Sequence, residues 1–229
     1  MNDILFPAAD RTEFDTWWNT SGEWVEPANV RRNGESGVQR LMPDDPHQPV
    51  LYLKRQTGHL YRSVAHPFGR PTVLRELDAY RAWDRLGITL PKVVYGGARR
   101  QNGEWQAILV TEALTGFTDM GDWYASGAHQ ACAPAVRRVL LDELALALAK
   151  LHKAYWQHGC LYPKHIFVNA AENDPALALL DLEKCRRRFN RAAAVRNDLD
   201  QLYRHRGAMP DEDWRYLSTR AASLHALFL

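Results

Sequence analysis

The sequence has few cysteines, few lysines and no long apolar run. Its three cysteines, Cys132, Cys160 and Cys185, are odd in number and far apart, which argues against a disulfide framework and against a Cys-x-x-Cys zinc site. We therefore expect reduced thiols. No stretch approaches the roughly 18 uninterrupted apolar residues of a membrane span. The first residues also lack the cationic segment of a secretory signal. These absences favour a cytoplasmic location.

Most of the basic residues are arginine, and lysine is scarce. Of the 29 basic residues only six are lysine, which leaves 23 arginines, and 27 acidic residues reduce the net charge to +2. This near neutrality, without an RNP, zinc-finger or basic-zipper pattern, argues against nucleic-acid binding. A chain of 229 residues that is 46% hydrophobic can bury one large or two small cores.

The first half of the chain carries mainly strand patterns. Asp10 is the predicted N-cap of a short amphipathic helix that carries Phe14, Trp17 and Trp18. Short strand patterns follow at residues 23–26, 38–42 and 50–56. Since no helical pattern separates these three strands, we expect them to pair in antiparallel fashion.

A helical pattern begins at Thr72 and ends at Gly87, which favours a helix terminus. Two further strand patterns follow at residues 92–95 and 106–112. This half therefore predicts an antiparallel sheet with one main helix.

The second half is mainly helical. Apolar residues from Val136 to Tyr155 recur at helical spacing and predict one long helix that ends at His158-Gly159. The elements expected after it are, in order, a polar loop, short strands at 166–168 and 177–180, the carboxylate of Asp181, a helix that opens at Asp198, and a last helix at 211–228.

Two segments of this half are distinctive: HGCLYPKHIFV at 158–168 and LLDLEK at 179–184. With them, residues 23–205 resemble the lipopolysaccharide kinase family of InaA and WaaP type, within the protein-kinase-like superfamily. The resemblance implies an α+β, protein-kinase-like two-lobed fold. Residues 1–112 would form an N-lobe with an antiparallel β-sheet and one main helix, and residues 113–229 a mostly helical C-lobe.

The resemblance also implies an activity. It predicts a phosphotransferase that uses ATP and Mg²⁺ to phosphorylate a hydroxyl of a lipopolysaccharide core sugar, such as heptose or Kdo. The acceptor would be met at the inner face of the inner membrane, which implies peripheral contact with that membrane.

Lys54 matches the kinase lysine that holds the inner phosphates of the nucleotide, and Glu76 matches its ion-pair partner. A buried pair needs both members, because either charge alone would be uncompensated. The alternatives are an exposed strand lysine and a solvated helix glutamate. The scarcity of lysine favours the functional interpretation.

Two further segments match nucleotide contacts. Gly34 and Gly37 could let backbone amides approach phosphate, although a plain hairpin turn is an equal alternative. Glu112 and Ala113 fall where the hinge between the lobes is expected, so that their backbone groups would hydrogen-bond adenine.

Asp181 matches the magnesium-binding aspartate of the kinase pattern, although Leu182-Glu183 replaces the usual Phe-Gly. His165 stands where protein kinases place a metal-binding asparagine. Imidazole can ligate a divalent ion, but a structural hydrogen-bonding histidine is the alternative. We expect His158 to stabilise the loop, and Asp198 to hold the same loop in place from the following helix.

Cys160 stands where kinases have the aspartate that accepts the acceptor's proton. A thiol with a reference pKa of about 8.5 is a poor substitute. The alternative to an active kinase is therefore a pseudokinase that binds nucleotide as a regulatory module in an envelope or stress response. Lys164 adds a cation that could stabilise the transferring phosphate. The alternative is a loop lysine without a functional role.

Five arginines follow Asp181 closely. Guanidinium groups suit phosphates and carboxylates, so this segment favours contact with an anionic sugar or glycolipid. A solvated, arginine-rich helix face is an equal alternative. The five are Arg186, Arg187, Arg188, Arg191 and Arg196.

Overall fold

The chain divides into two compact units in the computed structural model, which describes residues 11–31 and 34–228. One unit comprises residues 1–78 and 91–113, and the other comprises residues 79–90 and 114–229. Asp10, the predicted N-cap of the first helix, lies outside the described residues. The lobe boundary after residue 112 stays a prediction.

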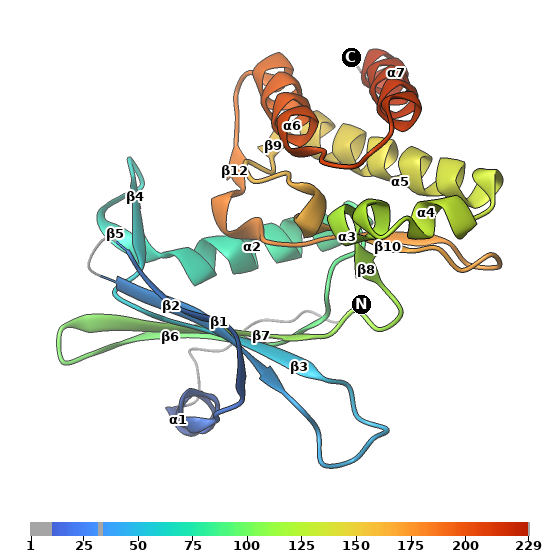
Figure 1. The fold of residues 1–229 in the computed structure, drawn as a ribbon. Helices are drawn as coiled ribbons and strands as arrows, with labels where there is room; N and C mark the ends of the chain where they lie inside the picture. The colour runs from blue at the N-terminus through green and yellow to red at the C-terminus, as the bar shows by residue number, and fades with distance from the viewer. Residues whose placement is uncertain (1–10, 32–33, 229) are drawn as a thin grey trace. The chain divides into compact units, whose positions relative to one another are not determined.

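A five-stranded antiparallel sheet forms most of the first unit (Figure 1), and its strand order is β1-β2-β3-β7-β6. The prediction that the first three strands pair in antiparallel fashion is confirmed. The strands are β1 (Glu23–Arg31), β2 (Gly34–Leu41), β3 (Leu51–Thr57), β6 (Val93–Gln101) and β7 (Glu104–Glu112).

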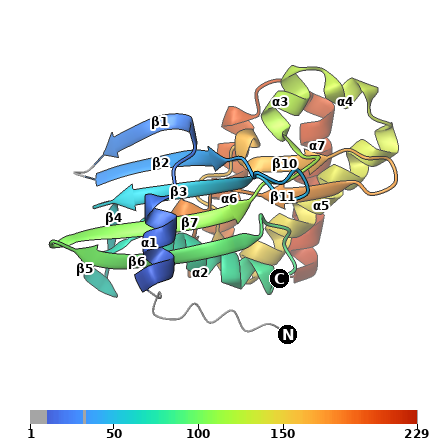
Figure 2. The ribbon, with the colours of Figure 1, turned by 90° about the horizontal axis from the view of Figure 1, so that it is seen from below.

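Helix α1 (Arg11–Asn19) covers one face of this sheet, and Figure 2 shows it lying across β7 and β6. Its Phe14 is buried against Leu53, Tyr95 and side chains of β7, and Trp17 and Trp18 pack at the edge of the same cluster. Burial of aromatic side chains contributes much of the hydrophobic free energy in such a small core. The spacing of Phe14, Trp17 and Trp18 in the sequence thus places all three on the side of the helix that packs against the sheet.

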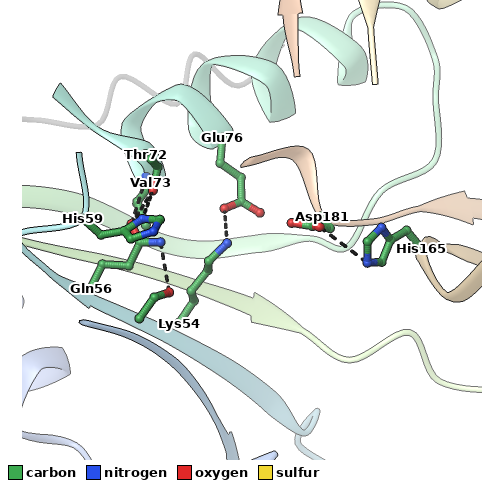
Figure 3. Close-up of polar contacts among 9 residues, drawn as sticks. Lys54, Gln56, His59, Thr72, Val73, Glu76, His165 and Asp181 are labelled. Carbon is green, nitrogen blue, oxygen red and sulfur yellow. Dashed lines mark hydrogen bonds and ion pairs between the residues drawn. The ribbon is translucent and has the colours of Figure 1, made fainter. Parts of the chain in front are cut away.

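The opposite face of the sheet carries Lys54 and Gln56, because residues two apart on a strand point to the same side. The buried Gln56 amide accepts hydrogen bonds from Thr72 Oγ1 at 2.7 Å and from the Val73 N–H at 3.3 Å (Figure 3). Its Nε2 donates to Ser36 Oγ at 3.1 Å. Gln56 therefore satisfies the N-terminus of helix α2 (Thr72–Asp84) from the sheet.

A hairpin that the sequence did not predict precedes α2. It consists of β4 (Leu60–Ser63) and β5 (His66–Pro71), which pair in antiparallel fashion. Its last strand runs directly into the helix, so the hairpin fixes where α2 begins.

Helices dominate the second unit, and α5 (Pro134–Lys153) and α7 (Asp211–Phe228) pack along each other. The mixed architecture, with an antiparallel sheet in one unit and mainly helices in the other, confirms the α+β class. In the described part of the chain no helix is both long and apolar enough to cross a membrane. The elements of this unit after α2 are β8 (Thr118–Asp119), α3 (Met120–Ala125), α4 (Ala128–Ala131), α5 (Pro134–Lys153), β9 (Trp156–Gln157), η1 (Pro163–His165), β10 (Ile166–Asn169), β11 (Ala176–Leu179), η2 (Leu182–Lys184), β12 (Arg186–Arg187), α6 (Arg191–His205) and α7 (Asp211–Phe228).

The long helix ends earlier than predicted. Helix α5 stops at Lys153, and Tyr155 adopts a positive φ of 62°. Trp156 and Gln157 then pair with β12 as a short antiparallel ribbon. The predicted end at His158-Gly159 is wrong because this pairing with a distant segment overrides the helical periodicity.

The sixth helix begins earlier than predicted. It opens at Arg191 and not at Asp198, because the Asn190 side chain accepts a hydrogen bond from the Ala193 N–H at 2.9 Å. Asn is among the most effective N-caps. Asp198 consequently lies in the middle of the helix, where its side chain is free to bond another segment.

Candidate functional site

The first unit holds a nearly buried ion pair. Lys54 Nζ on β3 donates to Glu76 Oε2 on α2 at 2.8 Å, and the side chains are 15% and 4% exposed (Figure 3). Glu76 lies one turn after Thr72, the residue that Gln56 holds. The same strand that carries Lys54 therefore sets the position of its partner, and the ammonium has little freedom to move.

The predicted glycine contacts have a packing explanation as well. Gly34 begins β2, and a Cβ there would lie 2.6 Å from the Gly58 carbonyl carbon and 2.7 Å from the His59 nitrogen. Only glycine permits this approach. Gly37 lies within β2 opposite Arg55. A phosphate contact at either glycine stays a prediction.

The predicted hinge residues lie at the end of β7 and just after it. The Glu112 N–H donates to the Lys92 carbonyl at 2.9 Å, and the Ala113 N–H donates to the Val50 carbonyl at 2.8 Å. Both N–H groups are thus already hydrogen-bonded within the first unit. An adenine contact at this segment stays a prediction, and one that used either N–H would have to share or displace these bonds.

In the second unit, Asp198 anchors the loop that follows β9. Its carboxylate accepts hydrogen bonds from the His158 N–H at 2.8 Å and the Gly159 N–H at 2.9 Å. It also lies 3.1 Å from His152 Nε2. Burial alone would raise the pKa of Asp198, but the hydrogen bonds from His152 and Gly159 hold it below its ordinary value. Asp198 therefore stays ionised and fixes the loop through its backbone.

Gly159 and His158 complete this anchor. Gly159 has a φ of 73°, and a Cβ there would lie 2.9 Å from the Lys184 carbonyl, so the turn requires glycine. The His158 ring is fully buried, packs edge-on against Trp83 and lies parallel to the His165 ring. Burial lowers the pKa of His158 to about 4, so its ring is neutral near pH 7.

Asp181 and His165 meet on the other side of this loop. Asp181 follows β11 in a left-handed conformation, with a φ of 56°, and its Oδ2 lies 3.5 Å from His165 Nε2 (Figure 3). His165 Nδ1 donates to the Cys160 carbonyl at 2.7 Å. Burial lowers the pKa of His165 despite the nearby charge of Asp181. The ring is therefore neutral near pH 7 and turns Nε2 toward the carboxylate.

Cys160 is buried beside these two residues. Its pKa rises to about 11, mainly through burial and then through the negative charge of Asp181. A thiol is a nucleophile or base only as the thiolate. Within the protein alone, Cys160 is therefore suited to neither role near pH 7.

Most of the remaining predicted residues are exposed. Lys164 lies in η1 with its side chain in solvent. Among the arginines after Asp181, Arg186, Arg187 and Arg196 are exposed, and Arg188 and Arg191 are partly buried. The Arg187 guanidinium lies over the Trp156 ring, and Arg188 Nε donates to Gln157 Oε1 at 2.7 Å. Part of the arginine run thus holds β12 against β9.

Sequence reasoning missed several residues that shape these sites. His152 contacts Asp198, and its Nδ1 lies 2.9 Å from His225 Nε2 on α7. Gln201 Oε1 accepts a hydrogen bond from the Leu161 N–H at 2.8 Å. Gln56 could have been found, because it lies two residues after Lys54 and therefore on the same face of the strand. The others have no local signal, because their partners are 40 or more residues away.

Comparison with known proteins gives three consistent matches. The model of the lipopolysaccharide kinase (Kdo/WaaP) family matches residues 15–220. Protein InaA of Escherichia coli (strain K12) is 44% identical over 207 residues, which cover 90% of this chain and 94% of that protein. A solved structure of WaaP in complex with acyl carrier protein superposes with a TM-score of 0.68 at 17% identity, covering 100% of this chain and 95% of that one. The last match confirms the predicted fold.

Proposed function

Because this chain belongs to the lipopolysaccharide kinase (Kdo/WaaP) family, we propose that it is an ATP- and magnesium-dependent phosphotransferase. Its acceptor is a hydroxyl of a lipopolysaccharide core sugar such as heptose or Kdo. The observation that carries the proposal is the Lys54–Glu76 pair, which holds a scarce lysine in one position on the sheet. In phosphoryl transfer the protein mainly positions phosphates and supplies positive charge, and a fixed ammonium serves that purpose.

Asp181 supplies the oxygen ligand for magnesium, and His165 lies beside it. Magnesium in proteins commonly takes one or two carboxylates together with substrate phosphates and water, so a single aspartate fits this group. When bound, the ion would neutralise charge on the phosphate oxygens. The loop that carries His165 is fixed by Asp198, which gives the ligands a constant geometry.

The test is calorimetric titration with MgATP, followed by an ATP turnover assay with and without lipopolysaccharide core oligosaccharides. We expect the native protein to bind MgATP and the Lys54→Ala and Asp181→Ala variants to lose binding. Lys153→Ala, which changes an exposed lysine at the end of α5, is the matched control and should bind normally. Absence of MgATP binding by the native protein would overturn the proposal.

A second function, nucleotide binding without catalysis, is favoured by the buried Cys160 thiol, whose pKa of about 11 prevents it from accepting a proton near pH 7. Under this alternative the protein is a regulatory pseudokinase of an envelope or stress response. MgATP binding without turnover on any core acceptor would favour it. A large gain of turnover in Cys160→Asp would show that the native chain lacks a carboxylate base at this position and that the cysteine is a handicap to phosphoryl transfer.

We place the acceptor contact at the exposed arginines after Asp181. Guanidinium groups form paired hydrogen bonds with phosphate and carboxylate, so an anionic sugar or glycolipid suits them. Arg186→Gln and Arg196→Gln should raise the KM for the acceptor and leave the KM for ATP unchanged. Arg215→Gln, an exposed arginine on α7, is the control. Equal effects in all three variants would contradict this placement.

The peripheral membrane contact belongs to the same segment. The Phe189 ring is fully exposed between Arg188 and the N-terminus of α6. An exposed aromatic ring among arginines suits the interface of an anionic bilayer. Phe189→Ser should reduce co-flotation with vesicles that contain anionic lipid, whereas vesicles of neutral lipid should bind neither form. Unchanged flotation would exclude this residue as the anchor.

A further inference from the structure

Three different metal-binding groups converge in the second unit. Cys160 Sγ, a ring nitrogen of His165 and a carboxylate oxygen of Asp181 all lie within 4.8 Å of one another. They come from three separate segments: the loop after β9, the η1 turn and the end of β11. In a tetrahedral zinc site, bond lengths of about 2.0–2.3 Å place neighbouring ligand atoms roughly 3.3–3.8 Å apart. Small rotations of the side chains would bring these atoms to that spacing.

His165 is oriented as a metal ligand. Its Nδ1 must be the donor of the 2.7 Å hydrogen bond, because the Cys160 carbonyl can only accept. Histidines that bind metal usually donate their other ring N–H in this way, which fixes the ring and its tautomer. In the neutral ring, Nε2 then presents a lone pair to Asp181 Oδ2 at 3.5 Å. A cation bound between them would be coordinated by both atoms.

The ligand set decides which cation fits best. Magnesium prefers six oxygen ligands and has little affinity for sulfur. One thiolate, one imidazole and one carboxylate suit zinc and similar ions, which accept nitrogen and sulfur. Cys160 is 3% exposed, whereas the Asp181 side chain is 31% exposed. A buried sulfur with a more open carboxylate leaves room for a fourth, exchangeable ligand such as water.

The charges also allow a divalent ion. A Cys160 thiolate and the Asp181 carboxylate together balance two positive charges. On binding, the S–H bond breaks, the proton passes to solvent and the sulfur–metal bond forms. Lys184 lies near Cys160 and opposes the ion, but its side chain is exposed and can turn into solvent.

We propose that Cys160, His165 and Asp181 bind one zinc-class divalent ion with three protein ligands and an open fourth position. The site uses residues of the second unit alone and requires no nucleotide. Cys160 is accordingly a metal ligand that changes the ion preferred at Asp181. The site shares Asp181 with the proposed magnesium site, so zinc is titrated without nucleotide and MgATP without zinc, and each binding is scored separately.

The test is titration of the metal-free full chain with Co²⁺, a spectroscopic substitute for Zn²⁺. We expect one equivalent to bind with a thiolate-to-cobalt charge-transfer band, and Zn²⁺ to remove that band in competition. Excess Mg²⁺ should leave the band in place. Cys160→Ser should abolish the band and weaken Zn²⁺ binding by about 100-fold or more, because loss of a ligand should cost at least as much as loss of a ligand's hydrogen-bond partner.

Matched variants locate the site. Cys132→Ser and Cys185→Ser should retain the band, since neither thiol belongs to the cluster. Asp181→Asn keeps the shape of a half-exposed side chain and should weaken binding, which gives a second test if Cys160→Ser fails to fold. A band that persists in Cys160→Ser, or one that magnesium displaces at similar concentration, would overturn the proposal. So would the absence of stoichiometric cobalt binding.

Discussion

The two units hold their key residues in different ways. In the first unit, Lys54 is fixed through its side chain, which pairs with Glu76. In the second unit, Asp198 fixes the loop through the N–H groups of His158 and Gly159. A backbone anchor does not depend on the neighbouring side chain. The loop can therefore keep its shape while a cysteine stands at position 160, whereas any change at position 54 disturbs Glu76 at once.

Removing the backbone anchor should have the largest effect. Asp198→Ala leaves a buried N–H of His158 and a partly buried N–H of Gly159 without their acceptor, and His152 without this carboxylate. We expect a loss of about 3–5 kcal/mol in the free energy of unfolding, measured by urea denaturation. Asp200→Ala, an exposed position on the same helix, should change this free energy by less than about 0.5 kcal/mol. Similar losses in both variants would contradict the anchor.

Acid should weaken the second unit through His158. Its pKa is lowered from 6.5 to about 4, so the unfolded chain takes up a proton at a higher pH than the folded chain does. Stability is therefore complete above pH 6.5 and falls as the pH drops toward 4. The shift corresponds to about 3 kcal/mol. Urea denaturation at a series of pH values measures this loss.

His158→Phe supplies the comparison, because it keeps a buried aromatic ring without a titrating group. The variant should show a shallower decline over the same pH window. Burial also lowers the pKa values of His165 and His225, which add a decline of the same sign and remain in the variant. An unchanged pH profile in His158→Phe would exclude His158 as the main source.

The Lys54–Glu76 ion pair should show coupling in the free energy of unfolding. Lys54→Met and Glu76→Gln should each cost about 2 kcal/mol, because each leaves a largely buried charge without this ion pair. The double variant should cost less than the sum, with a coupling free energy of about 1–3 kcal/mol. A double-mutant cycle by urea denaturation measures this. Additive losses would show that Lys54 and Glu76 act independently.

The exposed pair Lys92–Glu112 should show the smallest effect. Its atoms are only 2.6 Å apart, but the lysine side chain is 74% exposed. Water screens such pairs, so we expect a coupling free energy below about 1 kcal/mol in the cycle of Lys92→Met and Glu112→Gln. A value as large as that of Lys54–Glu76 would show that burial is not what separates the two pairs.

Residues that follow a local pattern were predictable from the sequence. Lys54 stands on a strand that its alternation reveals, and Asp181 ends an apolar strand. The family resemblance then identified both as candidates. Their distances to Glu76 and His165 follow from tertiary packing, which no local pattern encodes.

Features that depend on distant partners were missed. The apolar spacing of α5 continues past Lys153, so no local pattern indicates that the helix ends there. The pairing of Trp156 with Arg187 is a contact with a distant segment. The β4–β5 hairpin has Pro67 and Gly69 in its second strand, and these residues usually indicate a loop. The contact between His152 and Asp198 spans 46 positions. In each case a long-range contact decides the local structure.

The link between His152 and His225 gives the end of the chain an influence on a loop far from it in sequence. His225 lies in the last turns of α7 and contacts His152, which contacts Asp198. A cut in α7 before His225 would remove this imidazole and one end of this series of contacts. A change that disturbs the last turns of α7 should therefore also disturb the loop at His158 and Gly159.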